Sequence, residues 1–111
     1  MNFIIDKSIV ELGIKSVVIG IAKNIDPQAP LSDSLTKQKK MQDWALQCDV
    51  DEILKHPVTQ GYADLLQSVG RSIKKYPPTV PAFIRNIQRR GSMPHINSVI
   101  DIYNVESLHS L

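Results

Sequence analysis

The run Lys15-Ser16-Val17-Val18-Ile19-Gly20-Ile21-Ala22-Lys23 decides the expected fold of this 111-residue chain. Its β-branched residues are not interrupted by alternating polar ones, which is typical of a strand buried on both faces. Gly20 would let another part of the protein approach the backbone closely. Phe3-Ile4-Ile5 is a second, shorter strand candidate. The run therefore predicts a buried strand, and with it an α/β protein.

The rest of the chain predicts helices. Apolar residues recur at helical spacing in several segments, and Thr79 is a suitable N-cap. Gly70 and Gly91 are suited to follow the ends of helices. We expect an α/β (α+β) fold, rich in helix, with one strong buried strand, a single helical turn at 8–12 and about four to five helices at 32–47, 49–54, 58–69, 79–90 and from 97 onward.

The last helix has an alternative. Residues 98–105 are rich in β-branched side chains and could form a strand. A helix is favoured because Asn97 or Ser98 can cap it. No helix stop signal follows, and one dominant strand has too few partners for a stable sheet. Residues 1–111 are therefore expected to form a single, incomplete domain, or one that borrows strands from another chain.

Composition excludes several classes of protein. Cys48 is the only cysteine, so no internal disulfide can form, and a reduced, cytoplasmic setting is expected. No apolar run is long enough to cross a membrane, and the first residues do not form a secretory signal. Three scattered histidines give no zinc spacing, and nucleotide-binding glycine loops are absent. No metal and no cofactor are expected.

Charge is strongly segregated along the chain. The window from Leu65 to Ile100 holds 6 of the 13 basic residues and none of the 11 acidic ones. Such segregation suggests an anionic partner, most commonly a nucleic acid. The alternative is a solvated basic face without a partner, and two of the arginines would also favour the C-terminal end of a helix dipole. The six residues are Arg71, Lys74, Lys75, Arg85, Arg89 and Arg90.

A line of polar residues marks the last segment, Pro94-His95-Ile96-Asn97-Ser98-Val99-Ile100-Asp101-Ile102-Tyr103-Asn104. On a helix, Asn97, Asp101 and Asn104 would fall at positions i, i+4 and i+7, on one face. These groups either satisfy one another and nearby backbone, or they face a ligand.

This segment carries a resemblance. Together with Lys74-Lys75-Tyr76-Pro77-Pro78-Thr79-Val80 and the helix that ends at Gly91, it resembles the tRNA-binding (editing) domain of the phenylalanyl-tRNA synthetase beta subunit. The likeness is greater to the free-standing relatives of that domain and extends over essentially the whole chain. In the synthetase, the domain is an α/β module that hydrolyses tyrosine wrongly attached to the phenylalanine tRNA.

The resemblance implies roles for individual residues. It places Tyr103 and Asn104 in the substrate pocket, with Asn104 as the candidate catalytic residue. Asn97 and Asp101 are expected to be structural. The other pocket residues of the family, including a His and a Glu, lie beyond Leu111. The chain would thus hold the N-terminal half of a tRNA-binding domain, related to aminoacyl-tRNA hydrolases or associated with phenylalanine-tRNA ligase, but without a complete pocket.

Two other functions stay open. One is a non-catalytic interaction module whose half-sheet is completed by a partner or by a second copy, as in a homo-oligomer. The other is a small helical DNA-binding protein that uses the helix at 79–90.

Overall fold

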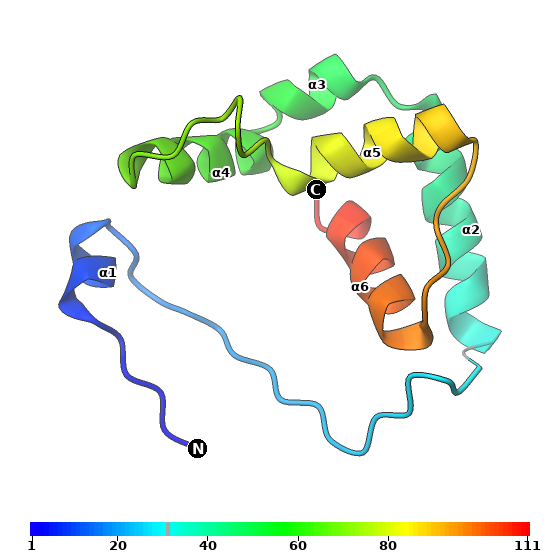
Figure 1. Ribbon diagram of the computed structural model, residues 1–111, viewed down its shortest axis with the longest axis horizontal. Coiled ribbons are helices and arrows are strands. Elements are labelled where there is room, and N and C mark those ends of the chain that lie inside the picture. The colour runs from blue at the N-terminus through cyan, green and yellow to red at the C-terminus, as the bar shows by residue number, and fades with distance from the viewer. Residues whose placement is uncertain (31) are drawn as a thin grey trace.

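The computed structural model describes residues 1–30 and 32–111, without the side chains of Ser32 and Asp33. Every regular element in this described part is an α-helix (Figure 1). The helices are α1 (Lys7–Glu11), α2 (Ser32–Gln47), α3 (Val50–Lys55), α4 (Pro57–Ser68), α5 (Thr79–Arg90) and α6 (Ser98–His109).

The expected α/β fold with a strong buried strand is wrong for these residues. The segment 15–23 is extended, but it pairs with no other segment and its residues are exposed. Val18, at its centre, is 97 % exposed. Phe3, Ile4 and Ile5 are exposed as well. A strand forms only where a neighbouring backbone supplies hydrogen-bond partners, and no described segment does so here. A β-branched sequence alone is therefore not sufficient for a sheet.

The helical expectations are mostly confirmed. All the expected helices form, with bounds within two residues of those predicted where an end was given. Asn97 caps α6 by accepting a hydrogen bond from the Ile100 N–H at 3.0 Å. Gly91 follows α5 in the left-handed conformation, with φ of 78°. The expected Thr79 cap is wrong, because Pro78 occupies the N-cap position of α5 and supplies no side-chain hydrogen bond.

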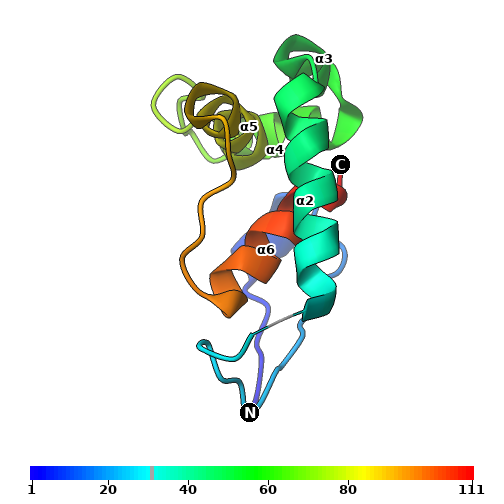
Figure 2. The ribbon, with the colours of Figure 1, turned by 90° about the vertical axis from the view of Figure 1, so that its right-hand side faces the viewer.

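The core lies where α2 meets α5 and α6 (Figures 1 and 2). It is formed by one apolar stripe from each of these helices and by Met93 from the loop between α5 and α6. Trp44, Cys48 and Phe83 pack against it at its edge. Its buried members are Met41, Ala45, Ile84, Ile87, Met93, Val105 and Leu108.

The apolar stripe expected on α4 is not buried. Val58, Tyr62 and Leu65 are exposed, and the buried residues of α4 are Thr59 and Ala63. This helix packs against the short α3, which offers too little surface to cover the larger side chains. The apolar face of α4 therefore borders solvent.

Residues 1–25 form an N-terminal arm that curves away from the helices (Figure 1). No residue from 1 to 30 is buried. Just after the arm, Pro27 connects the chain to the start of α6. Its carbonyl accepts hydrogen bonds from the Ser98 backbone N–H at 3.1 Å and from the Ser98 hydroxyl at 2.7 Å. The radius of gyration is 16.4 Å, compared with about 13 Å for a compact chain of this length. The arm accounts for the difference.

No helix among the described residues has the length and apolar character needed to cross a bilayer.

Candidate nucleic-acid interface

The loop between α4 and α5 carries three of the six basic residues, and two of the three lie beside a tyrosine ring. Gly70 turns the chain with φ of 75°, and the backbone N–H groups of Lys75 and Tyr76 both donate to the Ser72 carbonyl. This turn brings the Arg71 guanidinium to 5.1 Å and the Lys75 ammonium to 5.6 Å from the centre of the Tyr76 ring. Both distances are within the range of cation–π attraction. The loop thus presents ordered cations beside an exposed aromatic ring.

The arginines of α5 lie on the side of the helix opposite the core. Ile84 and Ile87 are buried, so helical periodicity turns Arg85 and Arg89 outward. These two arginines line a small hollow of about 180 Å³ on the surface of α5. Arg90 lines a different groove, between α5 and α6. The six residues Arg71, Lys74, Lys75, Arg85, Arg89 and Arg90 are called the basic surface below.

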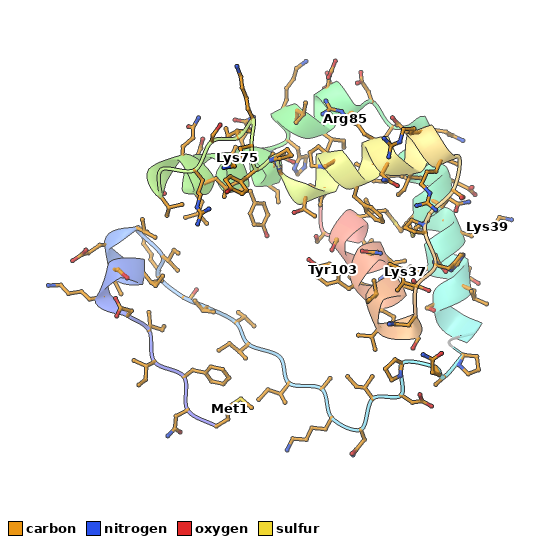
Figure 3. All side chains as sticks on the ribbon, viewed as in Figure 1. Met1, Lys37, Lys39, Lys75, Arg85 and Tyr103 are labelled. Carbon is orange, nitrogen blue, oxygen red and sulfur yellow. The ribbon has the colours of Figure 1, made fainter. Side chains whose placement is uncertain are left out.

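The charges of the basic surface are not neutralised by acidic partners. Among the side chains that the structure describes, ion pairs join Lys37 to Glu106, Lys55 to Glu52 and Lys7 to Glu11. The others join a histidine to a carboxylate. None involves a residue of the basic surface, and all six residues are exposed. In Figure 3, Lys75 and Arg85 lie along the upper edge of the molecule, whereas Lys39 lies on α2 at the right. The six cations are free to meet an anionic partner.

The polar line on α6 is mostly structural, as expected. Asn97 caps the helix, and Asp101 Oδ1 accepts a hydrogen bond from the Ile96 N–H at 3.0 Å. Asp101 Oδ2 lies 3.5 Å from His95 Nδ1, which is 3.1 Å from the Gln38 amide nitrogen. These contacts hold the turn before α6 in place. Asn97 and Asp101 also line a hollow of about 220 Å³ between the segment 27–30 and the first turns of α2.

Tyr103 and Asn104 do not share a pocket. Asn104 lines the open groove between α5 and α6, which measures about 590 Å³ and also contains Asn86 and Arg90. Tyr103 lines a separate groove, formed with the first turns of α4 and α5. Consecutive residues on a helix are about 100° apart, so the two side chains are directed to different surfaces. The structure brings Asn104 together with Arg90, and it separates Asn104 from Tyr103.

Several residues at these surfaces were not predicted from the sequence. Tyr76 sits between the loop cations, and a signal was available, because an aromatic residue interleaved with lysines is typical of nucleic-acid contacts. Asn86 lines both the hollow with Arg85 and the groove with Asn104. Nothing in its local sequence distinguishes it from a solvent-facing helix residue.

Cys48 belongs to the edge of the core rather than to either groove. It lies at the edge of the core and donates a weak hydrogen bond to the Ala45 carbonyl at 3.5 Å. Burial raises the pKa of the Cys48 thiol above its usual value of 9.0. Within the described residues, no three His, Cys, Asp or Glu side chains are grouped as metal ligands.

No protein-family model, curated protein or solved structure matches this chain. The resemblance to the editing domain therefore rests on the motif residues alone.

Proposed function

We propose that this chain is an RNA-binding domain that holds tRNA, or a similarly folded RNA, on its basic surface. The observation that carries the proposal is the set of six exposed cations without acidic partners, within a window that contains no acidic residue. An anionic backbone would neutralise this charge and release its counterions, which favours association. The motif at 94–104 favours tRNA as the class of RNA, in a cytoplasmic setting.

The side chains of the basic surface are suited to contact a phosphate backbone rather than base edges. Arg85 and Arg89 are one helical turn apart, and the Arg71–Lys75–Tyr76 cluster lies on the neighbouring loop. Side chains of this kind position a nucleic acid without reading its sequence. Affinity should therefore depend more on charge density and shape than on nucleotide identity.

Hydrolysis of a mischarged tRNA would need more than these contacts. Asn104 could orient a water molecule, but ester hydrolysis also needs a base and donors for the developing oxyanion. The groove that contains Asn104 has Arg90 as its only titratable lining residue among those described. The proposal is therefore RNA binding, with editing activity dependent on groups supplied from outside residues 1–111.

A matched pair of charge variants tests the proposal. The double variant Arg85→Gln/Arg89→Gln removes two cations from the basic surface, whereas Lys39→Gln/Lys40→Gln removes two exposed cations from α2. Binding of fluorescently labelled tRNA would be followed by anisotropy at 50 mM salt. The arginine pair should weaken binding by about 10-fold or more, because each lost phosphate contact removes favourable counterion release. The lysine pair should change it by less than about 3-fold.

Equal losses in the two double variants would show that binding is a diffuse charge effect and would contradict the assignment of this surface. An undetectable interaction with the unmodified protein would refute RNA binding altogether. Duplex DNA serves as the competitor. If it displaces tRNA at equal concentration, the alternative of a helical DNA-binding protein is favoured.

A second candidate function is an interaction module formed by two copies of the chain. The observation that favours it is the arm, whose segment 17–21 exposes its apolar side chains and pairs its backbone with no other described segment. Such a segment is a template for pairing with another strand. A second copy supplies an identical strand, and a two-fold arrangement would pair the two arms antiparallel.

Sedimentation equilibrium tests this candidate. The dimer proposal predicts a concentration-dependent dimer that Val18→Pro converts to monomer, because proline removes a ladder hydrogen bond. The control variant is Ser16→Ala, which keeps every backbone donor of the arm. A proline at Val10 would not serve as a control, because Val10 lies in α1 and the substitution would disrupt that helix. A folded monomer at all concentrations would exclude the candidate.

A further inference from the structure

A small groove lies where the first turns of α4 and α5 meet the last turns of α6. Its volume is about 160 Å³, several times the space of about 30 Å³ that one water molecule takes in the liquid. None of its lining side chains is charged. We call it the tyrosine groove, and its lining residues are Val58, Thr59, Tyr62, Pro78, Thr79, Val80, Pro81, Tyr103, Ser107, Ser110 and Leu111.

Thr59 contributes an unused polar group to this groove. Its side chain is buried, with 3 % of the residue exposed, and its Oγ1 has no hydrogen-bond partner among the residues that the structure describes. Buried hydroxyl groups in folded proteins are nearly always bonded, and a helical threonine can bond a carbonyl in the preceding turn. The Ser107 and Ser110 hydroxyls do this, donating to the carbonyls of Tyr103 and Ser107. The Thr59 oxygen itself is fully buried, so its side chain must rotate before the hydroxyl can donate to, or accept from, a ligand in the groove.

Two tyrosines stand at the same groove. Tyr62 of α4 is 63 % exposed, and Tyr103 of α6 is 65 % exposed. Figure 3 shows Tyr103 on α6, well away from Lys39 of α2. An aromatic ring this exposed loses hydrophobic stabilisation unless something stacks on it. Flat aromatic ligands suit such rings, and nucleobases stack on tyrosine without regard to sequence.

The groove is close to the loop part of the basic surface. Pro78, which lines the groove, follows Lys75 by three residues. Three residues span at most about 11 Å, so the backbone of Lys75 lies within that distance of the groove lining. An RNA strand whose phosphates contact Arg71, Lys74 and Lys75 would pass near the mouth of the groove.

We propose that the tyrosine groove accepts one unpaired base of single-stranded RNA. The base stacks on Tyr103 or Tyr62, and its polar edge bonds the Thr59 hydroxyl. Single-stranded RNA is commonly recognised in this way, because its bases can be unstacked and inserted between protein groups. The proposal rests on the RNA-binding function above and adds to it a preference for unpaired over paired RNA.

The experiment compares a single-stranded RNA hexamer that contains 2-aminopurine with a longer, stably paired blunt RNA duplex that presents no unpaired base. The unmodified protein should quench or shift the 2-aminopurine fluorescence and prefer the hexamer after correction for charge density. Tyr103→Ala should weaken binding of the hexamer by about 10-fold, while Tyr103→Phe should retain most of the affinity. Thr59→Val keeps the shape of the side chain and should weaken hexamer binding by about 3-fold or more, since it removes one hydrogen bond.

Ile102→Ala is the control, because Ile102 is the exposed neighbour of Tyr103 and does not line the groove. Duplex affinity should stay within about 2-fold of the unmodified protein in every groove variant, since phosphate contacts are unchanged. If Tyr103→Ala and Ile102→Ala bind the hexamer equally, the groove proposal is wrong while RNA binding stands. If neither RNA binds at 50 mM salt, both proposals are wrong.

Discussion

The side chain of Gln88 joins α5 to the end of α2, and removing its hydrogen bonds should lower the free energy of unfolding by a measurable amount. Its side-chain amide donates to the carbonyls of Ala45 and Cys48, both at 2.9 Å. The Ala45 carbonyl belongs to the last turn of α2 and the Cys48 carbonyl follows the end of that helix, where intrahelical donors are lacking. One side chain of α5 therefore satisfies two acceptors in a part-buried place, and it fixes the angle between two core helices.

The variant Gln88→Leu keeps the size of the side chain and removes both hydrogen bonds. Each bond contributes about 0.5–1.5 kcal/mol net, so the free energy of unfolding should fall by about 1–3 kcal/mol. With a urea dependence of about 1.5 kcal/mol per molar, the unfolding midpoint should fall by about 0.7–2 M. The assay is urea unfolding followed by helical circular dichroism.

Gln47→Leu is the matched control, because Gln47 ends α2 and is exposed. Its midpoint should remain within about 0.3 M of the unmodified protein, as for most exposed substitutions. If Gln88→Leu also falls in that range, Gln88 does not bridge the two helices, and the packing of α5 on α2 described above is wrong.

Three further predictions concern stability and reactivity. The hydrogen bond from the Lys37 ammonium holds the pKa of Glu106 below its usual 4.5. This pair therefore stabilises the fold above pH 4.5, and its contribution is lost as the pH falls through the lowered pKa. Between pH 6 and pH 3, the urea midpoint should fall less steeply in Lys37→Gln than in the unmodified protein. Ile84→Ala should cost about 2–5 kcal/mol, because Ile84 is fully buried, whereas Val18→Ala in the arm should cost under about 0.5 kcal/mol by the same assay. Cys48 should react slowly with a disulfide reagent at pH 7.5 and rapidly after unfolding, because burial raises its pKa; a fast reaction in the folded state would contradict its place at the core.

The helices could be predicted because their signals are local. The cap at Asn97, the glycine at 91 and the apolar stripe of α5 all act within a few residues. Their interactions do not depend on what the rest of the chain does.

Local signals could not show whether the strand expected at 15–23 would form. The segment 15–23 has the side chains of a buried strand, yet its burial depends on a partner strand that no described part of the chain provides. The same reason explains α4, whose Tyr62 stays exposed because α3 is too short to cover it. The pattern of apolar residues indicates which side chains of a segment could be buried, but tertiary contacts determine whether they are buried.

The candidate site was predicted in part. Six basic residues were identified from charge segregation, and the structure leaves all of them exposed without acidic partners. The pairing of Tyr103 with Asn104 in one pocket came from a resemblance, and the helical geometry separates the two side chains. Thr59 gave no sequence signal, because an unpaired hydroxyl is visible only in three dimensions.

The salt dependence of tRNA binding tests the central claim most directly. If the basic surface contacts phosphates with all six of its cations, the logarithm of the association constant should fall with the logarithm of salt concentration with a slope of about −4 to −5. The slope should be about 1–2 units shallower in Arg85→Gln/Arg89→Gln and unchanged in Lys39→Gln/Lys40→Gln. A slope near zero for the unmodified protein, or the same slope in both double variants, would contradict the account.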